Sequence, residues 1–321
     1  MTAEGQAIVK VYVLHENPDW FAPVGTALDA ADVPYEQWLL GDSLLDLGMQ
    51  PPEGVFWSRM SASSHTRGHP HAKDQTRGVL SWLESCGRRV VNGRRVLELE
   101  MSKVDQLVAL RAAGFDVPRT VAVAGTRELT AAAARLPAPF ISKHNQGGKG
   151  LGVRLFDSHD EFDAYLASAE YEPPVDGITL LQEYLRSAKP RITRAEIVGG
   201  EFVYAITADT ALGGFQLCPA DACAVGGGRA VGGGPVPDLF ALREGFDHPI
   251  TGRYVDFARR RGIEIAGFEF IETADGRLVT YDINTTTNYN AAIEAAAPRS
   301  AQRAVAAYLR RLLADENRKA A

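Results

Sequence analysis

The chain of 321 residues has few cysteines and no long apolar run. Its three cysteines, Cys86, Cys218 and Cys223, have spacings that fit neither a disulfide framework nor a zinc site, so we interpret them as reduced thiols. No apolar stretch reaches the roughly 18 residues of a membrane span, and the first residues lack the basic and apolar regions of a secretion signal. These absences predict a cytoplasmic protein without a membrane partner.

Positive charge is also scarce. The chain has 34 Lys and Arg against 40 Asp and Glu, a formal net charge of −6. Binding to nucleic-acid phosphates needs clustered cations, so this balance argues against nucleic acid as a main partner. A composition of 45% hydrophobic and 23% charged residues is that of an ordinary globular protein, and the length allows two or three subdomains.

The first 100 residues alternate between strand and helix patterns. β-Rich runs at 7–14, 35–40, 55–57 and 88–91 are separated by helical patterns at 22–32 and 73–85. Such alternation predicts a small parallel α/β sheet. Segment 58–73 follows a strand's carboxyl end, where open α/β sheets place their ligands.

Segment 58–73 is polar and basic. Arg59 or Arg67 could attract an anion, most simply a carboxylate, and the alternative is a solvated polar loop. His65, His69 and His71 lack a fourth ligand and a helix, so their spacing argues against a metal site.

Ser102 predicts the start of a helix that covers 103–113. Lys103 then lies in the first turn, the wrong end of the helix dipole for a cation. It could reach a nearby anion, or it could be a surface lysine.

Residues 139–156 have the pattern of a strand, a glycine-rich loop and a second strand. The loop holds Gly147, Gly148, Lys149 and Gly150, and Lys143 precedes it. A Walker loop would need a following helix, so that motif is excluded. Backbone N–H groups of such a hairpin can still cover phosphates, and the alternative is a mobile turn.

Two acids and an amide come together in segment 264–290. Asp275-Gly276 predicts a two-residue turn, which places Glu269 opposite Asp282, with Asn284 on the same face. A symmetric four-residue loop keeps this pairing, whereas an odd-length loop breaks it. Opposed like charges repel each other, so either Mg²⁺ joins them or the acids extend into solvent or pair with Arg or Lys.

The remaining pattern predicts further elements. Residues 179–185 form an apolar strand ending in a hinge, and Gly199-Gly200 turns a hairpin. Helices are expected at 125–137, 249–261 and 291–313, with an interruption near Pro298. The glycine-rich segment 225–235 is expected to be a loop, either one that closes on a ligand or a plain connection.

In this order the motifs resemble the ATP-grasp superfamily, and among its members the RimK-type glutamate ligases and their amino-acid ligase relatives. The resemblance implies an α/β fold with α+β elements in three parts: an N-terminal pre-ATP-grasp α/β domain over 1–100, a helical linker and small lid over 101–186, and a C-terminal antiparallel-sheet metal-binding domain over 187–321. Relatives of this type are often homo-oligomers.

The resemblance also implies roles for individual residues. The nucleotide would be held by phosphate-binding, loop and hinge residues, namely Lys103, Lys143, Gly147, Gly148, Lys149, Gly150, Gln182, Glu183, Tyr184 and Leu185. Arg194 would act at the transferred phosphate. Two Mg²⁺ ions, replaceable by Mn²⁺, would be bound by Glu269, Asp282 and Asn284. Substrate contacts would come from Arg59, Arg67 and Asn288.

The implied activity is that of an ATP-dependent carboxylate–amine ligase, which forms an amide through an acyl phosphate and releases ADP and phosphate. Its substrates would be amino-acid-like acids and amines, or a peptide or protein terminus. Two positions depart from the family pattern: Ala208-Asp209 replaces a second arginine and Ile192-Thr193 replaces an acid, although Arg191 or Arg229 could substitute for that arginine. A kinase or a non-catalytic ATP-binding protein therefore remains an alternative.

Overall fold

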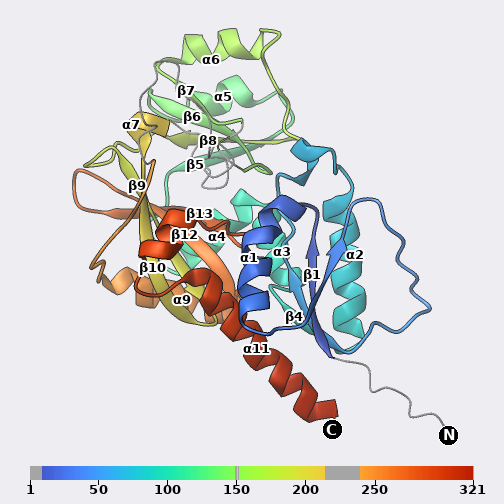
Figure 1. Ribbon diagram of the computed structural model, residues 1–321. Coiled ribbons are helices and arrows are strands. Elements are labelled where there is room, and N and C mark those ends of the chain that lie inside the picture. Colours follow the sequence, from blue (N-terminus) through green and yellow to red (C-terminus); the bar gives the residue numbers. More distant parts are fainter. Residues whose placement is uncertain (1–8, 149, 151, 214–238, 321) are drawn as a thin grey trace, which may run out of the picture.

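The computed structural model describes residues 9–148, 150, 152–213 and 239–320, arranged as three sheets with flanking helices (Figure 1). Lys149, Cys218, Cys223, Arg229 and the loop expected at 225–235 lie outside the described residues. Cys86 is half-buried and is not in a disulfide.

The N-terminal sheet is parallel, as the sequence predicts. Its order is β2-β1-β3-β4, with β1 at Lys10–His15, β2 at Tyr35–Leu39, β3 at Gly54–Ser58 and β4 at Arg89–Val91. Side chains of β1 alternate between two hydrophobic clusters: Val11 and Val13 pack with helix α1, Pro18–Ala30, whereas Tyr12 and Leu14 pack with α2, Ala72–Ser85. The 3-10 helix η1, Ser64–Arg67, lies in the polar segment that follows β3.

The second sheet is antiparallel and carries the glycine hairpin. Its order is β5-β8-β6-β7, with β5 at Thr120–Ala124, β6 at Phe140–His144, β7 at Arg154–Phe156 and β8 at Ile178–Glu183. Two helices cover it, α5 at Leu129–Ala133 and α6 at His159–Leu166. The helix predicted at 125–137 is wrong in extent, because Gly125 adopts a left-handed φ of 73° and Pro137 blocks continuation.

The third sheet has the order β11-β10-β9-β12-β13 and its described pairs are antiparallel. The strands are β9 at Arg191–Val198, β10 at Glu201–Asp209, β11 at Phe240–Leu242, β12 at Ile265–Glu272 and β13 at Leu278–Asn284. One face packs on α4, Lys103–Ala112, and α9, Pro249–Arg261, through Leu110, Tyr254, Phe257, Phe268 and Ile283. The polar residues of the candidate site therefore alternate onto the other face.

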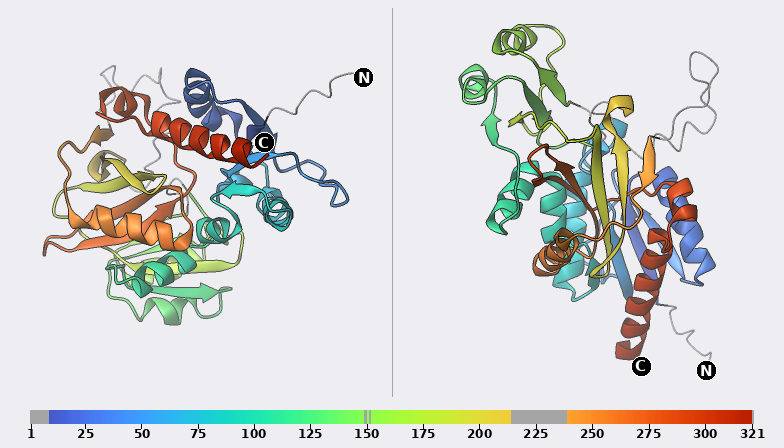
Figure 2. Two further views of the ribbon diagram at one scale, coloured as in Figure 1. Left: turned by 90° about the horizontal axis from the view of Figure 1, so that it is seen from below. Right: turned by 90° about the vertical axis from the view of Figure 1, so that its left-hand side faces the viewer.

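The remaining helices connect the sheets. They are α3 at Arg94–Met101, α7 at Thr210–Gly213, α10 at Ala291–Ala296 and α11 at Ala301–Ala320. The predicted interruption near Pro298 is confirmed. Figure 2 shows α11 running back along the N-terminal part, where it packs on α1 and β3. The two ends of the chain thus share one hydrophobic core.

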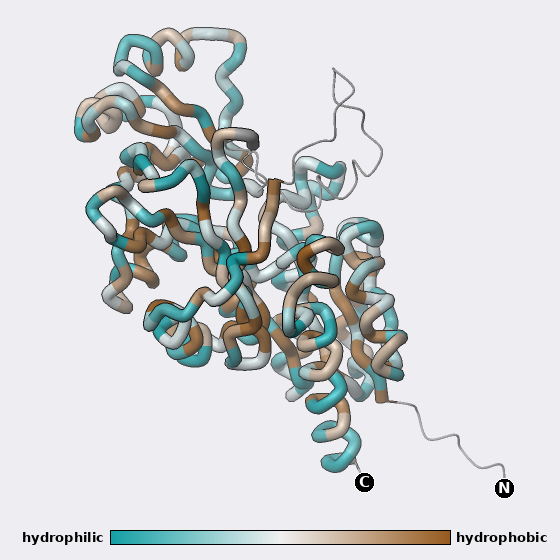
Figure 3. Tube along the Cα trace, turned by 60° about the vertical axis from the view of Figure 1, so that its left-hand side comes forward, coloured by the Kyte–Doolittle hydropathy of each residue, from teal (hydrophilic) through white to brown (hydrophobic). Residues whose placement is uncertain are grey.

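Hydrophobic residues concentrate on the strands inside the molecule, and hydrophilic residues on the outer turns of helices such as α11 (Figure 3). Among the described helices, none is long and apolar enough to cross a membrane.

Candidate active site

The hairpin of β12 and β13 brings the two predicted acids together, although its turn is not the predicted one. Thr273 and Arg277 pair across a three-residue loop, in which Gly276 has a φ of 83°. The ladder then shifts by one residue between Glu269 and Phe270, so that Glu269 still lies opposite Asp282. The predicted pairing is confirmed and the predicted two-residue turn is wrong: a bulge at the level of Tyr281 compensates for the odd loop.

Neighbouring strands complete the polar face. Arg194 on β9 pairs in register with Glu269 on β12, and its Nε donates to Glu196 Oε1 at 2.6 Å. Burial lowers the pKa of Arg194, but the carboxylates of Glu196 and then Glu269 outweigh it and raise the pKa. Arg194 therefore stays a fixed cation beside the two acids.

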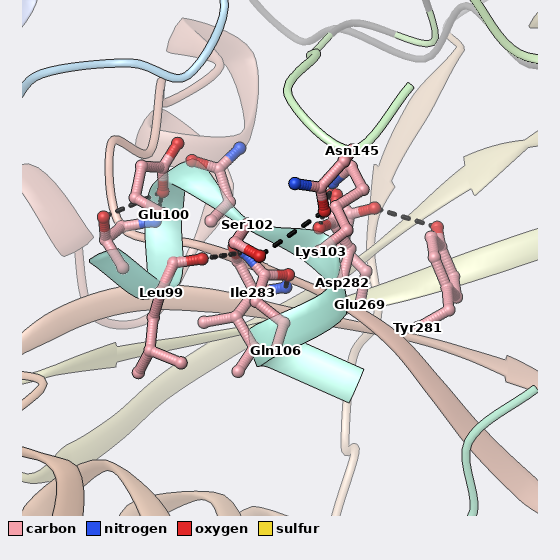
Figure 4. A network of polar contacts seen from close by, with 12 residues as sticks. Leu99, Glu100, Ser102, Lys103, Gln106, Asn145, Glu269, Tyr281, Asp282 and Ile283 are labelled. Atoms are coloured by element: carbon pink, nitrogen blue, oxygen red, sulfur yellow. Dashed lines mark hydrogen bonds and ion pairs between the residues drawn. The ribbon is translucent and has the colours of Figure 1, made fainter. Parts of the chain in front are cut away.

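Two lysines from other elements lie close enough to act on the acids, and Figure 4 shows the first of them, Lys103. Lys103, at the start of α4, donates to Asp282 Oδ1 at 2.5 Å. Burial lowers the pKa of Lys103, yet Asp282 more than offsets this and raises it. Lys143 on β6 is also buried, and burial followed by repulsion from Lys103 lowers its pKa to about 8. Burial and the proximity of Asp282 raise the pKa of Glu269.

The start of the glycine-rich loop is fixed to the beginning of α4. Asn145 Oδ1 accepts from the Val104 N–H at 3.0 Å, and Asn145 Nδ2 donates to Asp176 at 2.7 Å. The side chain of Ser102 caps α4 as predicted, because it accepts from the Asp105 N–H. The start of the loop is thereby tied to the helix that carries Lys103.

A cavity of about 350 Å³ lies between the second and third sheets. Its apolar wall includes Ile141, Val153, Leu155, Ile192 and Ile271. The predicted site residues on its lining are Lys103, Lys143, Gly147, Gly148, Gly150, Gln182, Glu183, Tyr184, Leu185, Arg194, Glu269, Asp282, Asn284 and Asn288. One continuous cavity therefore joins an apolar slot to a cluster of cations and acids.

The hinge residues are anchored at the slot end of this cavity. Gln182 Nε2 donates to Thr120 Oγ1 at 2.9 Å, and Glu183 Oε1 accepts from the Arg119 N–H at 2.7 Å. These contacts tie β8 to β5, and Tyr184 and Leu185, which follow β8, also line the cavity.

Two predicted substrate residues lie behind the cavity wall. Arg59 is 3% exposed and contacts Asn288, and Arg67 forms an ion pair with Glu16 while its guanidinium stacks on the Trp20 ring at 4.3 Å. Trp20 and Asn288 both line the cavity, but neither arginine does. The structure thus places Arg59 and Arg67 one layer behind the positions predicted for them.

Among the comparisons with known proteins, only the comparison with solved structures finds matches. No protein-family profile and no curated protein sequence matches the chain. The ATP-grasp ligase PsnB, solved with a minimal precursor, superposes with a TM-score of 0.64 at 15% identity, covering 95% of this chain and 99% of that one. A RimK domain ATP-grasp protein from Sphaerobacter thermophilus gives 0.65 at 15% identity, covering 94% and 99%. D-cycloserine synthetase DcsG gives 0.63 at 17% identity, also covering 94% and 99%.

The chain has the ATP-grasp fold. In this ATP-grasp structure the two departures noted in the sequence lie side by side, because Ala208 pairs with Ile192. Arg191, considered as a replacement cation, lies opposite Asp209 in the ladder between β9 and β10. Neither residue lines the cavity.

The polar residues of the ATP-grasp cavity that sequence reasoning missed include Glu100 and Tyr281. Glu100 on α3 accepts from the N–H and hydroxyl of Thr285, at 2.7 and 2.8 Å, and Tyr281 donates to Glu269 Oε2 at 2.8 Å. The apolar spacing of 96–101 could have revealed α3 and hence Glu100. No sequence signal marks Tyr281, since a bulge turns it toward Glu269.

The oxygen ligands of the cluster fit a hard divalent cation. Glu269 and Asp282 are opposed carboxylates, and Asn284 follows on the same strand face. The ammonium group of Lys103 already contacts Asp282, which shows that this carboxylate binds a positive charge. No group of three or more His, Cys, Asp or Glu suited to a metal occurs in the described part of the chain, so any ion here would complete its shell with the amide, water or phosphate.

Proposed function

We propose that the protein is an ATP-dependent ligase that joins a carboxylate to an amine, forming an amide and releasing ADP and phosphate. The observation that carries this proposal is one continuous cavity, in which an apolar slot leads past two lysines and an arginine to paired acids. The ATP-grasp fold is consistent with it. Three structural neighbours are described as a ligase, a synthetase and a macrocyclase.

ATP would occupy the length of the cavity. Adenine fits the apolar slot beside Glu183–Leu185, where the hinge backbone can hydrogen-bond to its edge. Lys103 and Lys143 would contact the α- and β-phosphates, and the N–H groups of Gly147, Gly148 and Gly150 would cover the outer phosphates. Lys149 belongs to the same proposed set.

Mg²⁺ fits the oxygen ligands of Glu269, Asp282 and Asn284, and we propose two ions, with Mn²⁺ as a substitute. Neighbouring structures contain Mg and ADP. When bound, the metal would neutralise charge on the phosphates. The chain's own contribution is to hold these ligands on two paired strands, so that little reorganisation is needed.

The reaction follows from these positions. A substrate carboxylate attacks the γ-phosphate, whose developing charge Arg194 and the lysines stabilise, and ADP leaves. An amine then attacks the acyl phosphate, and phosphate leaves as the amide forms. Neither step requires a covalent bond to the protein, so the cavity acts by positioning reactants and excluding water.

The substrates proposed are amino-acid-like acids and amines, with a peptide terminus or side chain as the second possibility. Structures of PsnB and of the macrocyclase MdnC from Microcystis aeruginosa were solved with precursor peptides, whereas DcsG is named for a small molecule.

The test is product analysis with purified protein, ATP, Mg²⁺ and pooled acids and amines. ADP and phosphate are expected only when both an acid and an amine are present, with a new amide detected by mass spectrometry. AMP and pyrophosphate would contradict the mechanism. A phosphorylated acid that accumulates without an amide would indicate a kinase, and ATP binding without turnover a sensor.

A further inference from the structure

Asn288 lies where two buried arginines meet the cavity. Its backbone carbonyl accepts from Arg194 NH2 at 3.1 Å, and its Oδ1 lies 3.4 Å from Arg59 NH2. Asn288 lines the cavity, whereas Arg59 does not. The residue therefore separates a buried cation from the space where substrate and phosphate would meet.

Arg59 is a buried charge whose hydrogen-bond acceptors among the described residues are all neutral. It is 3% exposed, and its guanidinium donates to the carbonyls of Trp20 and Thr287 at 3.2 and 3.0 Å, besides the longer contact to Asn288. The ring of Trp57 lies 5.1 Å from its guanidinium carbon. Burial lowers the pKa of Arg59 to about 10, and the carboxylate of Glu16, which already pairs with Arg67, offsets this only in part. Burying a charge without a counterion of its own is costly, so a second carboxylate would be expected beside Arg59.

Nearby arginines do have such carboxylates. Arg194 pairs with Glu196 and Arg67 pairs with Glu16, and both of these acids are buried. Around Arg59 the corresponding position is held by the neutral carboxamide of Asn288. An aspartate there would complete the pair and keep nearly the same volume, but it would also place a negative charge on the cavity wall.

We propose that Asn288 binds the carboxylate of the acid substrate and that it is neutral so that Arg59 can attract that carboxylate. A guanidinium has no acceptor, so its contact turns Oδ1 toward Arg59 and leaves the Nδ2 donor for the cavity. Arg59 is then a positioning residue, which orients the carboxamide and supplies positive charge that no hydrogen-bonded carboxylate neutralises. This inference rests on the proposed ligase function and names the residues that hold the carboxylate of its acid substrate.

The first test separates stability from binding. Asn288→Asp is expected to raise Tm by about 2 °C, because Arg59 gains a counterion, and to lose that gain in an Arg59→Met background. The matched control is Asn92→Asp in the same interdomain region, since Asn92 Nδ2 donates to the carbonyls of Ile265 and Thr285 at 2.8 and 3.3 Å. That variant should lower Tm. A drop in Tm for Asn288→Asp that persists without Arg59 would overturn the charge argument.

The second test measures binding. The twenty standard amino acids and a mixture of peptides with free terminal and side-chain carboxylates serve as acid source, with hydroxylamine as amine, and ADP release is followed. Asn288→Asp should raise KM for the acid that wild type uses at least tenfold, while KM for ATP changes less than twofold. An unchanged acid KM would refute the inference alone. A wild-type protein that binds ATP but releases no ADP with any acid would refute the ligase function, and the inference with it.

Discussion

Lys103 Nζ lies 2.5 Å from Asp282 Oδ1, and this pair joins the first turn of α4 to β13 at the centre of the cavity. Lys103 lies at the N-terminus of its helix, where the helix dipole disfavours a cation. The carboxylate of Asp282 offsets this unfavourable interaction. It also stands at the meeting point of the proposed metal and phosphate positions.

Replacing Asp282 with Asn should abolish Mg²⁺-dependent ATP turnover, by at least about a hundredfold, because a proposed metal ligand loses its charge. The free energy of unfolding should fall by about 1–3 kcal/mol, since the buried ammonium of Lys103 would lose the charged acceptor of its hydrogen bond. Turnover assays and urea unfolding measure the two effects. Asp275→Asn is the control, since this exposed turn residue lies off the cavity lining. Undiminished turnover in Asp282→Asn would remove it from the metal site.

Lys143 predicts a pH dependence of ATP binding. Its pKa of about 8 leaves it largely charged at pH 7 and largely neutral at pH 9. A bound phosphate favours the charged form, so ATP binding above pH 8 should take up a proton. Calorimetry in two buffers of different ionisation enthalpy measures this uptake. Lys143→Met should show none and should bind ATP about tenfold more weakly at pH 7. Equal uptake by both proteins would contradict the assignment.

The same group predicts a stability trend for the free protein. The unfolded pKa is near the ordinary 10.5 and the folded value is about 8, so between these pH values the unfolded chain holds more protons. The folded state therefore gains stability as pH rises through this window. Relative to Lys143→Met, wild type should become more stable from pH 8 to pH 10, as measured by urea unfolding at each pH.

The sequence predicted elements better than the contacts between them. Local signals such as the Ser102 cap and the stop at Gly262 correctly marked helix ends, because both are fixed within a few residues of chain. The opposition of Glu269 and Asp282 was predicted correctly from an incomplete argument. The prediction assumed a two-residue turn and no bulge, and the register shifts that these two features cause cancel each other. Contacts such as Lys103 with Asp282 depend on how α4 packs on the sheet, which local spacing does not encode.

Helix α3 was not predicted from the sequence, and so the role of Glu100 on that helix was missed. Its carboxylate accepts twice from Thr285, directly after the proposed metal ligand Asn284. Glu100→Ala should lower the free energy of unfolding by about 2 kcal/mol and weaken Mn²⁺ binding in the presence of ATP, because both Thr285 donors lose their acceptor. Glu100→Gln keeps an acceptor oxygen and should lose less than about 1 kcal/mol. Chemical unfolding and EPR of bound Mn²⁺ compare the two. Equal losses would mean that charge, rather than hydrogen bonding, is what Glu100 supplies.

The side chain of Arg194 packs against Gly267, where there is no room for a larger residue. A Cβ built on Gly267 would lie 2.9 Å from Arg194 Cδ and 3.1 Å from Cγ, closer than side chains pack. Gly267→Ala should therefore displace the guanidinium from Glu196 and from the carbonyl of Asn288, and reduce kcat about tenfold or more.

Steady-state kinetics and unfolding distinguish this displacement from a general loss of structure. Gly252→Ala is the matched control: Gly252 is exposed in helix α9, and nothing lies within 4 Å of its added Cβ. It should leave kcat unchanged and stabilise the protein by about 0.5–1 kcal/mol, because alanine restricts the unfolded chain and favours the helix. If Gly267→Ala kept full activity, Arg194 would tolerate displacement and its role at the transferred phosphate would be excluded. If Arg194→Lys were as inactive as Gly267→Ala while both stayed folded, the fixed fork of the guanidinium, rather than its charge alone, would be what the site requires.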